Sequence, residues 1–519
     1  MPVFTYDQIA DQLTTGYWNG SARAFDTGPD NTLYVDITGL TSAGQAMALQ
    51  ALDAWTMVTG IAFVQVDADT PPASTFSEAG DAPGNTSTPY SMSVGDDFLG
   101  TLATGSDRDN IGIALTAGQT ITIQLSGEGG SGTADPFLWL QDSSGSVVAQ
   151  NDDAAGLNSA ITYQVGTSGT YYIQAGSFND ANPGDYRISV REDGQVADIV
   201  FDDETAGAFS NSSVSGGEIQ SSFVNVSPSW AGGSARTDGY YFQTYIHEIG
   251  HALGLGHAGD YNGNATYGID NSYDNDSWQA SVMSYFHQTE NTAIDASFAY
   301  AITPQIADIL AVQTLYGVPE VNVGNTTYGN GSNTGTYLDT ALSLSNPVTF
   351  TIVDTGGIDT FDFSSFSAHQ RLDLRAESHS DLAGLTGNIG IARGTVIENG
   401  LTGTGNDTII GNDADNGLSA GFGADVIDGG AGNDAIRGGS GDDILSGEVG
   451  FDFIEGSTGN NSIDGGSGHD LLIGDDVTLA MLTFIYPTWA PPADAQSLLD
   501  DGDYSALWAA IQDDLGLVA

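Results

Sequence analysis

Hydrophobic positions at the two ends of the first 320 residues follow the spacing of helices and short strands. Between residues 42 and 59, apolar side chains recur every three or four positions, and Gly60 follows them. This spacing predicts a helix that ends at the glycine. Residues 61–66 and 197–201 predict strands, and residues 304–316 predict a second helix that ends before Gly317. We therefore expect one globular domain formed by residues 1–66 and 197–320.

A segment of different character, residues 67–196, interrupts this domain. Short runs of alternating apolar and polar residues lie between turns rich in Gly, Asp and Ser, which predicts an antiparallel β-sandwich. The segment resembles the pre-peptidase C-terminal domain in its Leu-Thr-Ala-Gly-Gln-Thr, Asp-Pro-Phe-Leu, Asn-Asp-Asp and Ser-Gly-Thr-Tyr-Tyr motifs, which begin at Leu115, Asp135, Asn151 and Ser168.

A period of nine residues governs residues 402–473. In each of eight consecutive units the eighth position is aliphatic, and the sixth position is Asp or Asn. Glycine-rich nonapeptide repeats of this kind form a parallel β-roll that binds calcium between its turns. Glycines permit the tight turns, the aliphatic residues fill the interior, and the carboxylates supply ligands for a hard cation. We expect a β-roll over residues 402–476, with calcium ligands at Asp407, Asp425, Asp434, Asp443, Asp452 and Asp470.

Weaker patterns flank the repeats. Residues 321–401 are rich in Gly, Thr, Ser and Asn with short β signals, so we expect a sheet-like lead-in to the roll. Residues 477–519 end in an acidic amphipathic stretch with Leu507, Trp508, Ile511 and Leu515 on one face. Two interpretations of this tail remain open, a helix that docks on the protein and a secretion signal.

Charge limits the partners of the chain. There are 67 Asp and Glu against 9 Lys and Arg, a net charge of −58, which would repel nucleic acid and anionic membrane surfaces. With 40% hydrophobic residues the composition is not that of a disordered chain, so bound calcium is the natural counterpart of the carboxylates. Cysteine is absent, which excludes disulfides and thiolate chemistry. No apolar run approaches the roughly 18 residues of a spanning helix, so we expect no membrane insertion.

The richest chemistry lies in the segment His-Glu-Ile-Gly-His-Ala-Leu-Gly-Leu-Gly-His, from His247 to His257. On a helix, His247 and His251 project from the same face and can hold one ion. Gly254 can then leave the helix with a positive φ and bring His257 to the same ion. Three neutral imidazoles suit Zn²⁺ and leave a coordination position for water, and Glu248 can act as general base and acid.

A methionine in Ser-Val-Met-Ser-Tyr, Met283, follows this segment. The zinc segment followed by a methionine turn is the metzincin pattern. Together with the roll, these motifs make the chain resemble a serralysin-type metalloendopeptidase over roughly residues 6–66 and 197–476. The resemblance implies an α+β metzincin catalytic domain, split here by the sandwich, with Met283 packed beneath the zinc ligands. It also implies that Tyr285 coordinates zinc and stabilises the oxyanion.

The resemblance has consequences for location and partners. It implies a secreted, extracellular enzyme that acts on protein or peptide substrates and leaves the cell through a type I, ABC-type export apparatus. We expect no secretory signal at the N-terminus, because residues 1–17 lack a cationic region followed by an apolar run. We also expect a monomer.

Two alternatives stay open. The chain could be a calcium-dependent surface or adhesion protein that keeps a metzincin fold without proteolysis, although the complete ligand set and Glu248 argue against this. In the insert, five carboxylates could bind a further calcium or could be solvated turn residues: Asp107, Asp109, Asp135, Asp152 and Asp153.

Overall fold

The computed structural model describes residues 1–65, 74–127, 135–152, 159–192 and 197–474. The chain divides into two compact units, one formed by Met1–Val64 with the described part of Asp198–Ala519, the other by Gln65–Ala197. The expected tail lies outside the described residues. No helix in the described ranges combines the length and apolar character needed to cross a membrane.

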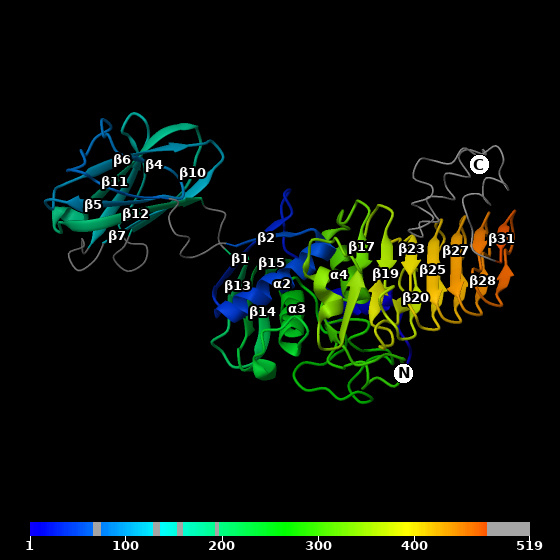
Figure 1. The fold of residues 1–519 in the computed structure, drawn as a ribbon. Helices are drawn as coiled ribbons and strands as arrows, with labels where there is room; N and C mark the ends of the chain where they lie inside the picture. Colours follow the sequence, from blue (N-terminus) through cyan, green and yellow to red (C-terminus); the bar gives the residue numbers. More distant parts are fainter. Residues whose placement is uncertain (66–73, 128–134, 153–158, 193–196, 475–519) are drawn as a thin grey trace, which may run out of the picture. The chain divides into compact units, whose positions relative to one another are not determined.

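The first unit begins with a five-stranded sheet backed by helices (Figure 1). Its strand order is β14 (Ala208–Ser215), β15 (Glu218–Val226), β13 (Ile199–Asp202), β1 (Thr32–Gly39) and β2 (Ala62–Gln65). Strands β1, β13 and β15 are parallel neighbours, whereas β14 pairs antiparallel with β15 and forms one edge. Its helices and helical turns are α1 (Tyr6–Asp11), the π-helical turn η1 (Gln12–Gly16), α2 (Ser42–Thr59), the 3₁₀ turn η4 (Trp230–Gly232), α3 (Tyr240–Ala252) and α4 (Ile306–Tyr316).

The two predicted helices occur where the pattern places them. Helix α2 spans residues 42–59, and its last turn is closed by Gly60 at φ 66°, a left-handed conformation that glycine adopts without a side-chain clash. Helix α4 starts two residues later than expected, after Gln305, and Asp308 completes a capping box there. Both helices contact the same core, in which Trp55 is fully buried and donates from its indole nitrogen to the carbonyl of Ile246 on α3 (3.0 Å).

The second unit is a β-sandwich, as the alternating pattern predicts. One sheet has the order β10 (Ser159–Gln164), β7 (Thr120–Gly127), β12 (Gly184–Glu192), β5 (Asp97–Leu102) and β3 (Thr75–Ser77). The other has the order β4 (Ser91–Met92), β6 (Asp109–Leu115), β11 (Gly169–Ser177), β8 (Pro136–Gln141) and β9 (Val147–Asn151), and the 3₁₀ turn η3 (Phe178–Asp180) follows β11. Inward-facing residues such as Ile123 and Ile173 form a core of their own, which is why this segment is a compact unit by itself.

Parallel strands form the remainder of the first unit. A four-stranded sheet contains β16 (Tyr300–Ala301), β18 (Val348–Ile352), β22 (Ile389–Ile391) and β21 (His379–Ser380), and the 3₁₀ segment η5 spans Tyr337–Ser343. A seven-stranded sheet contains β17 (Thr327–Gly329), β19 (Thr360–Asp362), β23 (Asn399–Leu401), β25 (Gly417–Phe422), β27 (Ala435–Ser440), β29 (Phe453–Glu455) and β31 (Leu471–Ile473). A five-stranded sheet contains β20 (Arg371–Asp373), β24 (Thr408–Ile410), β26 (Val426–Asp428), β28 (Ile444–Ser446) and β30 (Ser462–Asp464).

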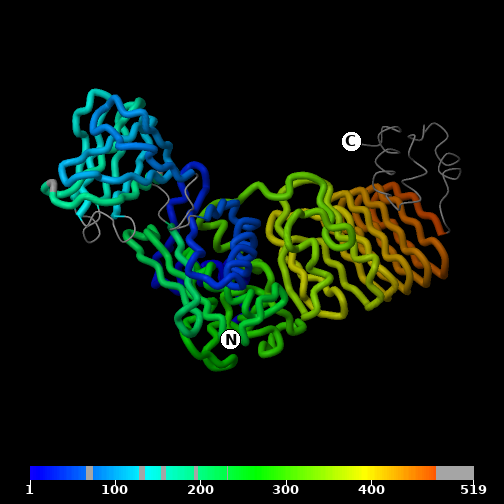
Figure 2. Tube along the Cα trace, turned by 60° about the vertical axis from the view of Figure 1, so that its left-hand side comes forward, coloured from blue at the N-terminus to red at the C-terminus, as the bar shows by residue number. Residues whose placement is uncertain are grey.

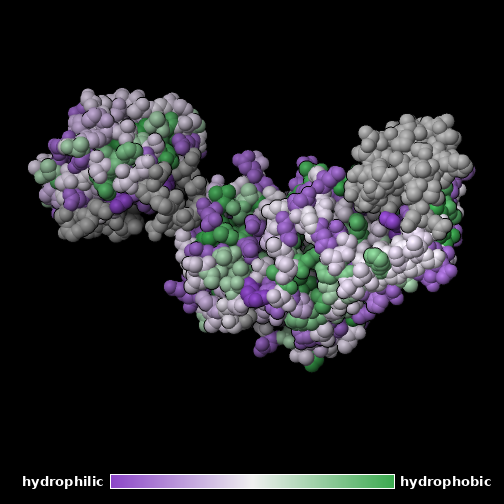
Figure 3. Space-filling model, in the orientation of Figure 1, coloured by the Kyte–Doolittle hydropathy of each residue, from purple (hydrophilic) through white to green (hydrophobic). Residues whose placement is uncertain are grey.

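The predicted parallel β-roll is confirmed. Strands pair with a step of 18 residues, so that Ile409 lies beside Ile427 and Leu418 beside Ile436. One turn of the roll therefore takes two nonapeptides, which contribute one strand to each sheet. Successive turns lie side by side along the roll (Figure 2), and its surface is largely pale in Figure 3, as its many Gly, Ser and Thr residues require. The seven-stranded sheet already begins at Thr327, so the lead-in shares the architecture of the roll.

A buried carboxylate connects the start of α3 to the chain before β18. Asp238 is 1% exposed, receives two hydrogen bonds from the Arg236 guanidinium (2.7 and 2.6 Å), and accepts from the backbone N–H groups of Ser345 and Asn346. These donors lower the pKa of Asp238 to about 2, the guanidinium making the largest contribution.

We expect Asp238→Asn to lower the free energy of unfolding at pH 7 by about 2 kcal/mol. Because the folded-state pKa lies below the ordinary value, this stabilisation is complete above about pH 4 and disappears as the pH falls towards 2. Denaturant unfolding of the variant and the wild type at several pH values measures the difference. Asp295→Asn, at an exposed position, is the matched control and should leave stability unchanged at every pH; an Asp238→Asn effect that does not vary with pH would contradict the explanation.

Candidate metal centre

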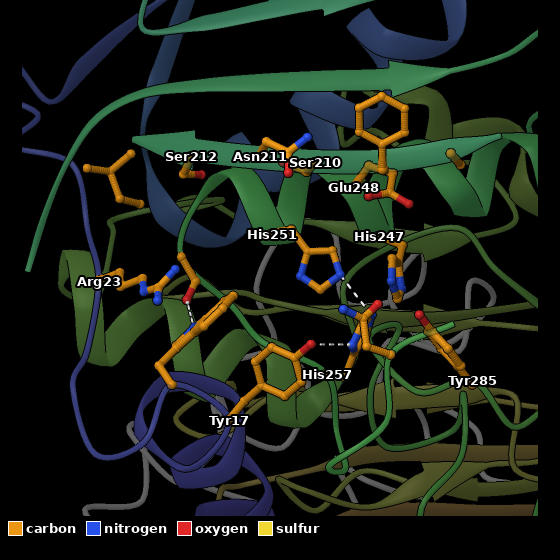
Figure 4. Close-up of a pocket in the computed structure, with 16 residues that line it drawn as sticks. Tyr17, Arg23, Ser210, Asn211, Ser212, His247, Glu248, His251, His257 and Tyr285 are labelled. Carbon is orange, nitrogen blue, oxygen red and sulfur yellow. Dashed lines mark hydrogen bonds between the residues drawn. The ribbon is translucent and has the colours of Figure 1, made fainter. Parts of the chain in front are cut away.

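Helix α3 and the turn after it bring three histidines together. His247 and His251 lie one helical turn apart, and the helix ends at Ala252. Gly254 has φ 104°, and a β-carbon there would lie 2.1 Å from the carbonyl oxygen of Arg23, so only glycine fits. The chain then reverses and places His257 against the other two imidazoles (Figure 4).

Hydrogen bonds fix the direction of each imidazole. Nδ1 of His247 lies 2.9 Å from the carbonyl oxygen of Val282, and Nδ1 of His251 lies 2.8 Å from that of Leu255. Since a carbonyl only accepts, these Nδ1 atoms carry the protons and the Nε2 atoms carry lone pairs. Nδ1 of His257 lies 3.1 Å from the hydroxyl oxygen of Tyr17, 240 positions earlier in the chain.

The convergence of these nitrogens fits a metal ion. Potential ligand atoms of the three histidines all lie within 4.8 Å of one another, and the Nε2 atoms of His251 and His257 are 3.0 Å apart. Two nitrogens on one tetrahedral zinc ion at ~2.05 Å would be roughly 3.3 Å apart. Burial lowers the pKa of His247 to about 4 and that of His251 to about 3, and it lowers the pKa of His257 as well, so the imidazoles are neutral at pH 7. Neutral, anchored imidazoles are the form that binds a cation.

Glu248 lies beside the histidines in a water-accessible cleft. Its side chain is 6% exposed, and its Oε2 atom has no hydrogen-bond partner in the described structure. Burial raises the pKa of Glu248 to about 8. Two adjoining cavities of about 320 and 390 Å³ share Glu248, His247 and Tyr285 in their walls.

Tyr285 also lies against the histidines. Its ring centre is 4.6 Å from that of His257 and 6.0 Å from that of His247, and its hydroxyl accepts from the N–H of Gly263 at 3.4 Å. Burial raises its pKa. Sequence reasoning placed this residue near the zinc ligands through the family resemblance alone, and the structure brings it there.

The methionine turn packs directly under α3. Met283 is fully buried, and a β-carbon at Gly250 would lie 2.6 Å from its sulfur and 3.0 Å from Cζ2 of Trp55. A side chain at Gly250 would force the buried Met283 sulfur and the Trp55 ring to shift, which favours glycine here. Buried Asp308 anchors the same turn, because its carboxylate accepts from the Ser281 hydroxyl (2.6 Å) and from the N–H of Val282 (2.7 Å).

Three of these residues escaped the sequence analysis. Tyr17 and Asp308 reach the site from distant segments, and no local sequence pattern predicts that they lie there. Gly250 is different, because a glycine inside a helix that carries metal ligands is itself a signal of close packing.

The repeat aspartates form two ladders along the roll. Each inner carboxylate accepts from the backbone N–H one turn earlier, as Asp425 does from Asp407 (2.7 Å) and Asp452 from Asp434 (2.9 Å). Their second oxygens are buried without a hydrogen-bond partner in the described structure at Asp407, Asp425, Asp434, Asp443 and Asp452. Burial, with neighbouring carboxylates, raises the pKa of Asp434 to about 8 and those of Asp425 and Asp452 to about 6. Such oxygens suit a bound cation.

Asp470 occupies the last described turn. Its Oδ1 accepts from the N–H of Asp452 at 3.2 Å, so it continues the ladder. A further acidic group, absent from the sequence analysis, lies in the lead-in: buried Asp354 and Asp359 face each other, and Glu398 accepts from the N–H of Asp359 (2.7 Å).

In the insert, the structure selects two of the five suggested aspartates. Asp107 and Asp109 have carboxylate oxygens within 4.8 Å of each other and of Asp81, which sequence reasoning did not suggest. Asp109 is fully buried, its Oδ2 accepts from the Tyr186 hydroxyl (2.8 Å), and its Oδ1 has no partner in the described structure. Burial raises its pKa to about 7, and nearby carboxylates contribute. Asp135 and Asp152 are not part of this group, and Asp153 lies outside the described residues.

Comparison with known families matches three parts of the chain. Residues 319–502 match the family described as Peptidase M10 serralysin C terminal, residues 107–177 match the bacterial pre-peptidase C-terminal domain, and residues 221–291 match Peptidase M66. A serralysin of Photorhabdus laumondii is 39% identical over 273 residues, which are 47% of this chain and 55% of that protein. The chain is related to the serralysins.

Other relatives agree. Metallopeptidase AprA of Pseudomonas marginalis is 46% identical over 184 residues (34% of this chain, 38% of that protein), and serralysin B of Dickeya chrysanthemi is 45% identical over 178 residues (34% and 37%). These matches confirm the predicted serralysin resemblance and the pre-peptidase C-terminal character of the insert. The chain spans between about a third and just over half of the length of the curated serralysins it matches.

The packing of Met283 under α3 leads to a test. Gly250→Ala adds a methyl group where the sulfur and the Trp55 ring leave no space, so we expect a net loss of roughly 1–3 kcal/mol of stability despite the better helix propensity of alanine. The displaced helix should also bind zinc less tightly. Thermal unfolding and competition with a chromophoric chelator measure the two effects. Gly324→Ala, where a β-carbon meets nothing within 4 Å, is the control; equal behaviour of the two variants would refute the steric argument.

Proposed function

We propose that this chain is a secreted zinc metalloendopeptidase that hydrolyses peptide bonds in proteins. The observation that carries the proposal is the convergence of three anchored, neutral imidazoles on one point, with the unpartnered carboxylate of Glu248 beside it in a cleft. In this proposal residues 1–66 and 197–320 form an α+β metzincin catalytic domain, residues 67–196 the inserted sandwich, and residues 321–401 and 402–476 the lead-in and the calcium-binding roll.

His247, His251 and His257 would hold Zn²⁺ through Nε2, and Tyr285 would supply a further ligand or withdraw from the ion. Bound zinc supplies Lewis acidity, which makes a water molecule more acidic and polarises a carbonyl group. The hydrogen bonds to Val282, Leu255 and Tyr17 keep the three lone pairs directed at the ion, which saves the enzyme the cost of orienting them.

Glu248 would move the proton. Its free carboxylate oxygen can take a proton from water as that water attacks the peptide carbonyl, and the same carboxyl group can then give the proton to the leaving amine nitrogen. Burial favours the protonated form between the two transfers, and a cation held by the three histidines would keep the carboxylate ionised before the first of them. Tyr285, whose raised pKa keeps the phenol protonated, would donate a hydrogen bond to the oxyanion that develops on the carbonyl.

Strand β14 would align the substrate. It is an edge strand of the five-stranded sheet, and its residues Ala208–Ser212 line the cleft. An extended peptide can add to such an edge, preferably antiparallel, and its backbone then lies across the three histidines.

Calcium would complete the fold. The buried oxygens without a hydrogen-bond partner at Asp407, Asp425, Asp434, Asp443 and Asp452 support calcium binding along both ladders, which Asp470 continues. We extend the proposal to the lead-in, where the buried carboxylates of Asp354 and Asp359 lie beside Glu398. In the insert, the buried and unpartnered oxygen of Asp109, together with Asp81 and Asp107, supports a separate calcium site.

Location and partners follow from the same chemistry. Carboxylates that repel one another without calcium suit a chain that folds where calcium is abundant, outside the cell. We extend the proposal to export through a type I, ABC-type apparatus and to a monomeric state. The alternative, a calcium-dependent surface or adhesion protein without proteolytic activity, would have no use for the free carboxylate of Glu248. A casein zymogram with and without a zinc chelator distinguishes the two functions: a clear zone that the chelator abolishes supports the peptidase, and no clearing supports the alternative.

The role of Glu248 is testable by an isosteric change. Glu248→Gln should keep one equivalent of zinc and lower kcat by about 10²–10⁴-fold, because the amide cannot accept the proton. Zinc content by atomic absorption and hydrolysis of a fluorogenic peptide give the two readouts. Glu204→Gln, at an exposed position outside the cleft, should keep full activity. Substantial hydrolysis by the Glu248 variant would exclude this residue as the general base.

The calcium proposal predicts that chelation of calcium lowers the melting temperature of both units. Asp434→Asn should raise the calcium concentration needed to fold the roll, and Asp109→Asn should do so for the insert, because each removes charge from one proposed site. Calcium titrations followed by circular dichroism and limited proteolysis measure the midpoints. Asp413, which is exposed in the roll, and Asp135, which is half-buried in the insert and outside the acidic group, provide the matched Asp→Asn controls. Midpoints that the two test variants leave unchanged would contradict the assignments.

A further inference from the structure

The cleft contains one fixed positive charge, Arg23. All nine cationic side chains of this protein are arginines, in a chain with 67 carboxylic residues. Arg23 lines the same cavity as His251, His257 and Glu248. Among the residues lining the two adjoining cavities, Glu248 is the one carboxylate and Arg23 the one arginine in the described structure. The cleft therefore contains few carboxylates compared with the rest of the chain, and it contains the cationic side chain of Arg23.

The other arginines are engaged elsewhere. Seven form ion pairs with Asp or Glu, and Arg108 donates to backbone carbonyls and stacks near Trp139; the seven are Arg187, Arg191, Arg236, Arg371, Arg375, Arg393 and Arg437. Arg23 differs, since no carboxylate of the described residues lies within ion-pairing distance of it. Asp260, the acidic residue that interacts with neighbouring Tyr17, accepts from Gln12 and does not line either cavity.

Arg23 is held in a fixed position. Its guanidinium carbon lies 3.7 Å from the ring centre of Trp18, and the Trp18 indole nitrogen donates to the carbonyl of Gly254 (2.8 Å). The next residue, Ala24, exchanges backbone hydrogen bonds with the chain at Gly217 and Ile219. A guanidinium stacked by its face keeps its in-plane N–H groups available for a planar, two-pronged contact with a carboxylate.

The position of Arg23 along the cleft defines which part of a substrate it meets. Ala208 lines both cavities, whereas Phe209 to Ser212 line only the cavity that contains Arg23. In Figure 4, Ser210, Asn211 and Ser212 follow β14 away from Glu248 towards the side of Arg23, and Tyr285 lies at the other side. A peptide antiparallel to β14 therefore passes Arg23 before it reaches Glu248, so the residues near Arg23 precede the scissile bond.

We propose that Arg23 is a specificity-determining residue that selects an acidic side chain, Asp or Glu, on the amino-terminal side of the scissile bond. This inference rests on the proposed peptidase function and adds a substrate class to it. The long-range field of a chain with net charge −58 opposes acidic substrates, but salt screens that field beyond about 8–10 Å, whereas the contact with half-buried Arg23 is direct. The contact with Arg23 distinguishes acidic from neutral substrate side chains inside the cleft.

The test compares Asp with its uncharged isostere Asn. The starting point is a fluorogenic peptide that the full-length, calcium- and zinc-loaded protein cleaves. Each of the four positions before the scissile bond is changed in turn to Asp or Asn. The same changes at the four positions after the bond serve as the internal control. For the wild type, we expect kcat/KM to favour Asp on the order of tenfold at one or two of the preceding positions. This ratio should fall with rising ionic strength, and the positions after the bond should show no preference for Asp.

Variants separate charge from packing. Arg23→Met keeps a long side chain over Trp18 and should reduce the Asp/Asn ratio to about one, Arg23→Lys should retain part of it, and Arg23→Glu should favour Lys at the same position. Zinc content should stay close to the wild-type value in all three, and the Asp/Asn ratio is taken within each variant, so that a general change in activity cancels. Arg191→Gln, which leaves Asp97 its second partner Arg187, removes the same charge outside the cleft and should not change the ratio.

The outcomes distinguish the two proposals. Cleavage by the wild type without preference for Asp at any preceding position, or a preference that persists in Arg23→Met, overturns the role of Arg23 and leaves the peptidase intact. Failure of the wild type to cleave any peptide overturns the peptidase and this inference with it. If Arg23→Met does not fold, the reversal expected in Arg23→Glu and the salt dependence of the wild-type ratio still decide the matter.

Discussion

Buried ligand-type atoms that converge on one another are the constraint on which the rest of this structure depends. At the candidate metal centre they are the Nε2 atoms of His251 and His257, 3.0 Å apart, and in the roll they are the second oxygens of the inner aspartates. The Nδ1 proton of His251 points to the carbonyl oxygen of Leu255, and the second oxygens of the aspartates have no hydrogen-bond partner in the described structure. A positive ion at each meeting point, as proposed above, would balance both arrangements.

Glycine allows the backbone to approach this centre as closely as it does. Gly250 lets the methionine turn touch α3, Gly254 turns the chain beneath Arg23, and Gly256 leaves space for the ring of Tyr17, whose atoms would lie 2.4 Å from a β-carbon there. Three contacts of this kind join the N-terminal segment, α3 and the chain around Met283 into one rigid frame. The histidines are then held from several directions, which is the condition for a preorganised site.

The sequence predicted the structure correctly where residues of one type recur with a fixed period or spacing. The aliphatic eighth positions predicted the roll, and the structure buries Ile409, Leu418 and Ile427 in its interior. The spacing of His247, His251 and His257 predicted a common ion, and the structure brings their nitrogens together. The N-terminal third also contains the alternation that predicted a separate sandwich.

What the sequence did not reveal depends on contacts between distant segments. Tyr17 reaches His257 across 240 positions, and Asp81 approaches Asp107 and Asp109 only because the insert folds them onto one another. The lead-in contributes strands to the sheets of the roll but lacks the nine-residue period. The architecture of residues 327–401 could therefore not be predicted from the sequence. Asp354, Asp359 and Glu398 were missed for the same reason. Proximity between distant segments that neither a repeat nor a motif spacing links leaves no trace in a single sequence.

The step of 18 residues has a consequence for how such a roll changes in length. One nonapeptide supplies half a turn, and both halves obey the same pattern, so a roll can gain or lose a single repeat without losing its interior or its ladders. An insertion whose length is not a multiple of nine residues would move aliphatic side chains outwards. A change by one repeat also moves the last strand from one sheet to the other, so that the chain leaves the roll on its opposite face. Whether the number of repeats is odd or even thereby determines on which of the two faces of the roll a following segment begins.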